Sequence, residues 1–128
     1  MDDMTATILV VDDEGDFLLY VRNLLEQAGY RVLQAVDGME AMVTVQNEKP
    51  DLVLTDLVMP HCNGYQLARN LRSSGFKSIP IVSLTGYPFR DDISRGNDKL
   101  VDLYLTKPIQ SQDLLAAISI CLDRVPKS

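Results

Sequence analysis

Short runs of hydrophobic residues alternate along the chain with longer stretches in which hydrophobic residues recur every three or four positions. The short runs are rich in β-branched residues and contain few polar positions. Such runs are typical of parallel strands that are covered on both faces. We therefore expect five strands, at residues 8–11, 32–36, 52–54, 79–84 and 103–105.

The stretches between these strands have helical spacing. The first extends from Phe17 to Ala28, and Gly29 is placed to end it. Hydrophobic residues mark three further helices, around 41–45, 67–71 and 114–122. Asn63 and Gly75 are expected to flank the helix around 67–71 at its start and end.

Alternation of strand and helix, repeated five times, predicts an α/β domain built on a doubly wound parallel sheet. The chain has 128 residues, the usual size of one domain. No internal repeat, low-complexity tract or linker interrupts the pattern. We expect a single domain over residues 1–128, with its core at about 6–124.

Composition and charge exclude several functions. The net charge of -6 and the lack of a basic patch argue against direct binding to nucleic acid. The longest hydrophobic run, 114–122, is too short to span a bilayer, and the acidic N-terminus does not resemble a secretory signal. Cys62 and Cys121 are too few for a disulfide framework and lack metal-ligand spacing, which favours packing roles. These features predict a cytoplasmic protein without a membrane partner.

Polar residues follow the expected strands where each one ends. Asp12 and Asp13 follow the first strand, Asp56 the third, Thr85 the fourth and Lys107 the fifth. Carboxyl ends of parallel strands meet at one edge of a sheet, so these residues are expected to lie together. If the first and third strands are neighbours, the three carboxylates repel one another, and a divalent cation such as Mg²⁺ relieves that repulsion.

These residues stand in motifs that resemble those of the receiver domain of two-component response regulators. The motifs are ILVVDDE at 8–14, DLVLTDLVMP at 51–60 followed by Asn63-Gly64, SLTG at 83–86 and YLTKP at 104–108. The resemblance covers essentially the whole chain, in the family's order and spacing. It implies a flavodoxin-like (βα)5 fold whose five-stranded parallel sheet has the strand order 2-1-3-4-5.

The resemblance also implies a phosphoacceptor site. Asp56 would accept a phosphoryl group from the phosphohistidine of a sensor histidine kinase or a histidine phosphotransfer protein. Asp12, Asp13, Asp56 and the backbone carbonyl of Val58 would bind Mg²⁺, with Mn²⁺ as an alternative. The ammonium group of Lys107 would pair with the phosphoryl group, which suits a compact charge on a flexible stem.

A conformational switch is implied at the same edge. The Thr85 hydroxyl would move toward the new phosphoryl oxygens, and the rotamer of Tyr104 would follow. The Lys107–Pro108 peptide bond would be cis. The switched surface, formed by the fourth helix, fifth strand and fifth helix, would bind a downstream protein target or a second copy of the chain. The domain would promote only its own phosphorylation and dephosphorylation, so we do not expect an enzyme.

Three alternatives remain beside this interpretation. A flavodoxin-like nucleotide binder would need a phosphate-binding Ser/Thr/Gly loop after the first strand, where residues 12–16 read DDEGD. An aspartate-nucleophile phosphatase would need a second acid two residues after Asp56, where Val58 stands. A docking module that is never phosphorylated is disfavoured because the acids, Thr85 and Lys107 are all present.

Two regions depart from the family pattern. The segment 90–99 has few hydrophobic residues, so we expect a short or irregular fourth helix there, and Lys99, Leu100 and Val101 follow where small residues are common. Val58 and Tyr87 occupy the positions two residues after Asp56 and Thr85, which in this family control the access of water. Their size and apolar character predict slow loss of the phosphoryl group.

Overall fold

The computed structural model describes residues 5–56, 64–76, 78–85, 101–106 and 109–123 of the 128-residue chain. The strands are β1 (Thr7–Val11), β2 (Arg31–Ala35), β3 (Leu52–Thr55), β4 (Ile81–Thr85) and β5 (Leu103–Thr106). The helices are α1 (Gly15–Gln27), α2 (Gly38–Glu48), α3 (Gly64–Ser73) and α5 (Ser111–Asp123). The predicted alternation of strand and helix is confirmed for these elements.

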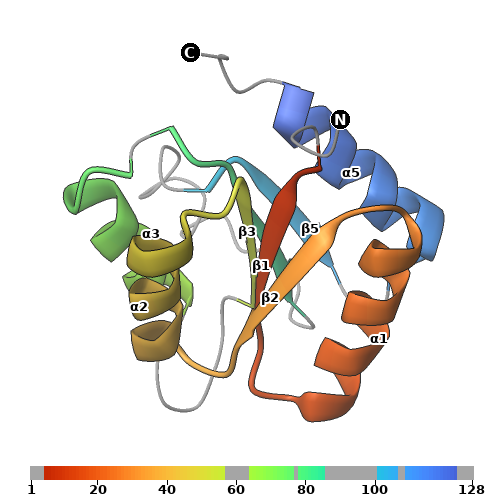
Figure 1. Ribbon diagram of the computed structural model, residues 1–128, viewed down its shortest axis with the longest axis horizontal. Helices are drawn as coiled ribbons and strands as arrows, with labels where there is room; N and C mark the ends of the chain where they lie inside the picture. The colour runs from red at the N-terminus through yellow and green to blue at the C-terminus, as the bar shows by residue number, and fades with distance from the viewer. Residues whose placement is uncertain (1–4, 57–63, 77, 86–100, 107–108, 124–128) are drawn as a thin grey trace.

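The five strands form one parallel sheet in the order β2-β1-β3-β4-β5. This is the predicted order, with the first strand beside the third. In Figure 1 α1 and α5 cover one face of the sheet, while α2 and α3 cover the other. The fold is therefore the expected doubly wound α/β layer structure.

Two hydrophobic cores lie on the two faces of the sheet, because successive side chains of a strand point to opposite faces. On β1, Ile8 and Val10 pack into the core under α1 and α5, whereas Leu9 and Val11 pack into the core under α2 and α3. Full burial of such a side chain stabilises the fold by about 1.5–3 kcal/mol. Cys121 belongs to the first core and is 2% exposed, which confirms its predicted packing role.

Helix ends follow local sequence signals. Asp37 is the N-cap of α2, and its carboxylate accepts a hydrogen bond from the Glu40 N–H at 2.8 Å. The Glu40 side chain in turn accepts from the N–H of Val36, the residue before the N-cap, at 2.8 Å, an arrangement close to a capping box. Gly29 follows the end of α1 with φ 100°, a backbone conformation that favours glycine, as predicted from its position.

Each strand differs from its predicted range by one or two residues at one or both ends, and two of these differences have a physical reason or consequence. β4 begins at Ile81 rather than at residue 79, because Pro80 has no N–H to contribute to the ladder. Val36 lies beyond the end of β2 and is 52% exposed. β2 is an edge strand, and its burial is only partial, although Val32 packs against one core and Leu33 against the other, so both of its faces are covered as predicted. The expected cap Asn63 and the irregular helix at 90–99 lie outside the described residues.

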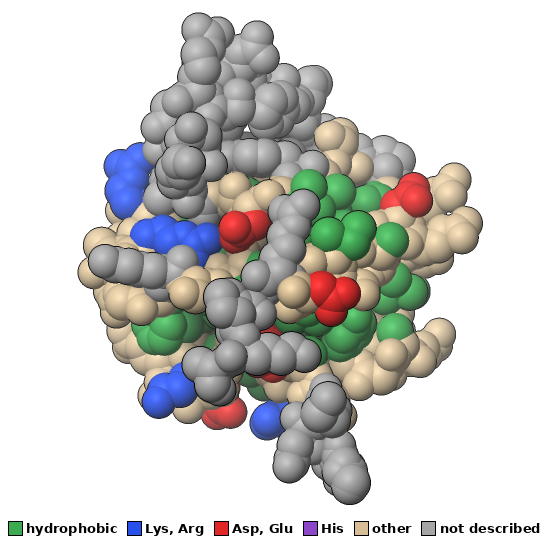
Figure 2. Space-filling model, turned by 90° about the horizontal axis from the view of Figure 1, so that it is seen from above, with side chains coloured by type: hydrophobic (Ala, Val, Ile, Leu, Met, Phe, Trp, Pro, Cys, Tyr) green, Lys and Arg blue, Asp and Glu red, His purple; other side chains and the backbone are tan. Residues whose placement is uncertain are grey.

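The end of the molecule at which the strands begin is shown in Figure 2. Acidic, basic and hydrophobic side chains are interspersed there among the described residues, without a large patch of one charge. Within the described part of the chain, no helix has the length and hydrophobicity needed to cross a membrane.

Candidate functional site

The structure brings two of the predicted acids to adjacent strand ends. Val11 of β1 pairs in register with Thr55 of β3, so the next residues, Asp12 and Asp56, leave neighbouring strands at the same level. The Asp56 N–H donates to the Val11 carbonyl at 3.1 Å, and the Asp12 N–H donates to the Ala35 carbonyl at 3.1 Å. The sheet hydrogen-bond network therefore continues to both acids and fixes their backbone positions.

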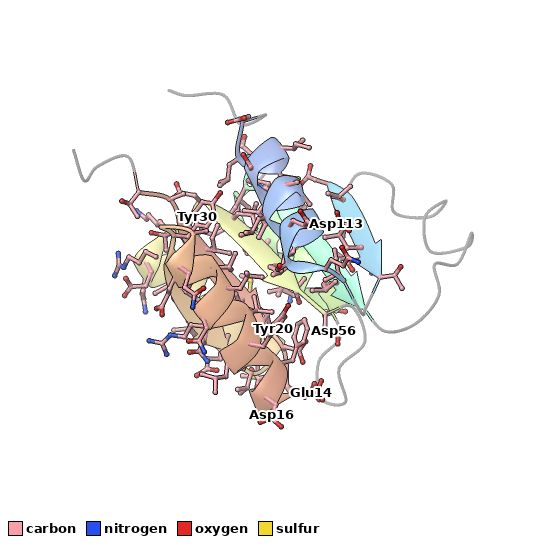
Figure 3. The ribbon with its side chains drawn as sticks, turned by 90° about the vertical axis from the view of Figure 1, so that its right-hand side faces the viewer. Glu14, Asp16, Tyr20, Tyr30, Asp56 and Asp113 are labelled. Carbon is pink, nitrogen blue, oxygen red and sulfur yellow. The ribbon has the colours of Figure 1, made fainter. Side chains whose placement is uncertain are left out.

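Both of these acids are buried. Asp12 is 2% exposed and Asp56 is 9% exposed, whereas Asp13 is exposed. The Asp12 carboxylate accepts a hydrogen bond from the Glu14 N–H at 2.9 Å, which holds the turn that leads into α1. In Figure 3 Asp56 lies at the end of the sheet, with Glu14 and Asp16 at the nearby start of α1. Burial of charged groups is costly unless they are compensated, so this arrangement calls for a counterion or for bonding partners.

The fourth and fifth strands end at the same edge. Thr85 is the last residue of β4 and pairs in register with Thr106, the last residue of β5. The next residue in the chain is Lys107, which lies outside the described residues together with Pro108 and Val58. Their predicted roles, including the cis peptide bond and the carbonyl ligand, stay predictions.

Two further predicted residues are described only in part. Tyr104 pairs in register with Ser83 in the middle of the β4–β5 ladder, and Thr85 lies at its end. The structure therefore gives their positions in the sheet, while the predicted movements of their side chains stay predictions. Tyr87, the proposed barrier to water, lies outside the described residues.

The described acidic side chains can be compared with the ligands that Mg²⁺ prefers. Among the described residues, no three His, Cys, Asp or Glu side chains lie close enough together to form a ready metal-binding group. Two buried carboxylates, Asp12 and Asp56, nevertheless lie on neighbouring strands. Mg²⁺ characteristically takes one or two carboxylates and completes its shell with water and phosphate oxygens. The residues present therefore fit this ion better than a cation that needs an all-protein shell.

Sequence reasoning missed two buried hydroxyl groups beside the acids. The Thr55 hydroxyl donates to the carbonyl of Asp56 at 2.9 Å, and Thr55 is 1% exposed. Ser83, its register partner on β4, is 0% exposed. Both stand as polar positions inside otherwise hydrophobic strand runs, and that exception to the pattern was the signal that could have identified them.

Comparisons with known proteins agree with this geometry. Residues 8–119 match the family model described as the response regulator receiver domain. The chain is 36% identical over 118 residues to Protein PilH of Pseudomonas aeruginosa, covering 91% of this chain and 98% of that protein. It is also 36% identical over 119 residues to the phosphate regulon transcriptional regulatory protein PhoB of the same organism, covering 92% of this chain and 52% of that one. The chain thus spans about half the length of PhoB.

A solved structure with the same fold is the receiver domain of a sensor histidine kinase from Pseudomonas aeruginosa, described with a magnesium ion coordinated in its active-site cleft. The two chains are 25% identical, the TM-score is 0.84, and the match covers 93% of this chain and 98% of that one. Family match, relatives, strand order and the position of Asp56 agree with one another. The chain belongs to the receiver-domain family of two-component response regulators.

Proposed function

We propose that Asp56 is the phosphoacceptor of this receiver domain and takes its phosphoryl group from a phosphohistidine of a sensor histidine kinase or a histidine phosphotransfer protein. One observation carries the proposal most directly. Asp56 leaves the central strand β3 beside Asp12, and both carboxylates are buried at the edge where the strands end. A rigid strand end presents one carboxylate oxygen to a donor without a search among side-chain conformers.

The reaction requires little beyond position and charge. An oxygen of the Asp56 carboxylate attacks phosphorus in line, the phosphorus–nitrogen bond of the donor breaks, and the imidazole nitrogen leaves with the bonding electron pair. Bound Mg²⁺ supplies charge stabilisation for the phosphoryl oxygens. Asp12, Asp13, Asp56 and the Val58 carbonyl are the ligands we propose for it, and Mn²⁺ has a similar preference for oxygen ligands. Lys107 offsets negative charge on the phosphoryl group.

The new phosphoryl group would then change a protein-binding surface. Its oxygens are acceptors near the end of β4, where Thr85 stands, and Tyr104 lies on the neighbouring strand. We assign these residues to the switch that alters the surface formed by the helix expected at 90–99, β5 and α5. A local charge change of this kind biases a two-state element. The altered surface binds a downstream protein or a second copy of the chain.

The proposed output is recognition by protein, with no reaction on a separate substrate. PilH, which the chain matches almost end to end, and PhoB, a transcriptional regulator of twice the matched length, are both relatives of this domain. The chain has a net charge of -6, which disfavours direct DNA contact by the domain itself. We place its action in the cytoplasm. Val58 and Tyr87, which stand two residues after Asp56 and Thr85 in the sequence, predict slow hydrolysis, and a phosphorylated lifetime of only seconds would contradict that part.

Acetyl phosphate provides a test without a partner kinase. The wild-type protein, Asp56→Asn and the matched control Asp51→Asn are incubated with acetyl phosphate and Mg²⁺, and intact mass is recorded. Asp51 lies just before β3, at the opposite end of the strand, and its carboxylate accepts the Thr7 N–H at 2.7 Å. The wild type and Asp51→Asn should gain one phosphoryl group, and Asp56→Asn should gain none. Equal modification of all three proteins would refute the assignment.

A further inference from the structure

Two buried hydroxyl side chains occupy paired positions on β3 and β4, and one of them, Thr55, directly precedes the phosphoacceptor position in the sequence. Thr55 and Ser83 are register partners on β3 and β4 and are 1% and 0% exposed. Strand alternation places them on the sheet face of Val53 and Ile81, which belong to the core under α2 and α3. Neighbouring strands are about 4.8 Å apart, so the two hydroxyls lie within reach of each other after rotation about χ1.

The first hydroxyl contacts the backbone of the acceptor. Thr55 Oγ1 donates to the carbonyl oxygen of Asp56 at 2.9 Å, in a buried environment. This bond fixes the orientation of the peptide that follows Asp56. The same peptide begins the segment that carries Val58, whose carbonyl we propose as a metal ligand. Thr55 therefore holds the carbonyl of Asp56, the last described residue before that segment.

The second hydroxyl has no hydrogen-bond partner among the residues that the structure describes. Buried polar groups are nearly always satisfied, and each exception calls for an explanation. An unsatisfied buried hydroxyl shifts the folding equilibrium unfavourably, by a factor of about ten. If residue 83 only filled space, alanine would be the more stable choice there because it lacks this penalty.

We propose that Thr55 and Ser83 form a two-position hydroxyl switch that holds the Asp56 carbonyl in the unmodified protein and releases it after modification. The single proton of the Thr55 hydroxyl goes either to the Asp56 carbonyl or to the Ser83 oxygen. In the structure it goes to the carbonyl, and the Ser83 hydroxyl neither accepts from Thr55 nor donates to it. When the Asp56 peptide moves, Thr55 turns to Ser83, and the buried hydroxyl becomes satisfied. The inference rests on the proposed function, because it takes Asp56 as the acceptor.

Ser83→Ala tests the released position. In the unmodified, metal-free protein the variant should unfold no more easily than wild type, and its folding equilibrium should improve by up to about tenfold. Its apparent affinity for beryllofluoride with Mg²⁺, measured by NMR shifts of the site, should fall by about three- to tenfold, because the modified state loses a bond. A variant that is less stable without ligand, or that binds beryllofluoride as wild type does, would overturn the proposal.

Thr55→Val and Thr55→Ser test the holding position. Valine keeps the shape and removes the donor, so the Mg²⁺ affinity and the rate of reaction with acetyl phosphate should fall by about tenfold. Serine restores the donor and should recover both quantities to within about twofold of wild type. Should Thr55→Val fail to fold, the beryllofluoride affinity still tests the proposal. It should fall in Ser83→Ala and stay near the wild-type value in Thr55→Ser, which keeps the donor. Loss of the donor without effect on either quantity would contradict the inference.

Thr44→Val is the matched control. Thr44 also donates its hydroxyl to a backbone carbonyl, that of Glu40, at 2.9 Å, but it lies on α2. It should leave Mg²⁺ affinity and phosphorylation unchanged. The two proposals fail differently. A wild-type protein that is not modified at Asp56 would refute the proposed function, whereas normal modification with Thr55→Val equal to Thr44→Val would refute only the hydroxyl switch.

Discussion

Charged side chains are arranged differently at the two ends of the sheet. At the end where the strands begin, the Arg72 guanidinium, 15% exposed, donates to the carbonyls of Phe76 at 3.0 Å and Ile79 at 2.7 Å and to the Asp102 carboxylate at 3.1 Å. The same Asp102 oxygen accepts the Ile81 N–H at 2.8 Å. Opposite charges and backbone groups satisfy one another here, so this cluster contributes to stability.

At the other end, like charges are brought together. Asp12 and Asp56 are buried on adjacent strands, and Asp13 follows in the chain. Such proximity costs stability, and a fold retains it where the charge has a use. The acid at the first end, Asp102, is 44% exposed and bonded to a guanidinium, whereas Asp12 and Asp56 are buried on adjacent strands. What distinguishes the two ends is therefore the burial of two carboxylates on adjacent strands at one end and a guanidinium bonded to an exposed acid and to backbone carbonyls at the other.

The largest expected effect is on chemistry at the acidic end. Asp12→Asn should slow phosphorylation by acetyl phosphate by about a hundredfold or more, because a charged carboxylate that we propose as a Mg²⁺ ligand is removed. Its free energy of unfolding should stay equal or rise, since repulsion between buried carboxylates is relieved. Reaction rates from intact mass and urea unfolding measure the two quantities. A variant that is less stable but is phosphorylated at the wild-type rate would show that Asp12 stabilises the fold and has no role in the chemistry.

The next effect is on stability at the opposite end. Arg72→Met keeps the aliphatic stem and removes the donors, which leaves the carbonyls of Phe76 and Ile79 without this partner. We expect a loss of about 2–4 kcal/mol in the free energy of unfolding, mostly from these carbonyls, because Asp102 is partly solvated. Urea unfolding gives the value. The phosphorylation rate at Asp56 should not change, and a large fall in that rate in the folded variant would link the two ends.

A third acid tests whether proximity to the site is enough for a role in it. Asp37 lies after β2, at the same edge, but its carboxylate caps α2. Asp37→Ala should cost about 1 kcal/mol of stability, and Asp37→Asn should cost much less because asparagine is also a good N-cap. Thermal unfolding compares the two variants. Slower phosphorylation in Asp37→Asn would show that Asp37 belongs to the site.

The smallest effect is expected on the surface. Arg22 and Glu26 form an ion pair at 3.1 Å on α1, with side chains 46% and 44% exposed. Glu26→Gln should change the free energy of unfolding by no more than about 0.5 kcal/mol, since solvent and salt screen the pair. Urea unfolding at low and high salt checks this. A loss of unfolding free energy comparable to that of Arg72→Met would mean that solvent exposure does not determine how much an ion pair contributes to the stability of this domain.

The sequence predicted the parts of this account that depend on pattern. Residues 8–11 read as a strand because hydrophobic side chains face both cores, and Asp12 and Asp56 fall at strand ends because the hydrophobic runs stop there. The edge position of β2 was not visible in residues 32–36, since hydrophobic composition does not report which neighbours a strand has. The Arg72 cluster was equally hidden, because it joins segments 30 residues apart.

The site was predictable only to the level of residue type. Asp12 and Asp13 look equivalent in the sequence, yet one is buried and the other exposed, because the strand ends between them and the turn into α1 begins. The Thr55 hydroxyl bond to Asp56 depends on a side-chain rotamer, which no hydrophobic pattern specifies.

Transfer from a phosphohistidine to Asp56 is the central claim, and one measurement tests it most directly. A phosphorylated histidine phosphotransfer protein is mixed with the wild-type chain and Mg²⁺, and the mass of both proteins is followed over time. We expect the donor to lose the mass of one phosphoryl group while the wild type and Asp51→Asn gain it, and Asp56→Asn to gain nothing. Equal gain by Asp56→Asn would show that Asp56 is not the acceptor.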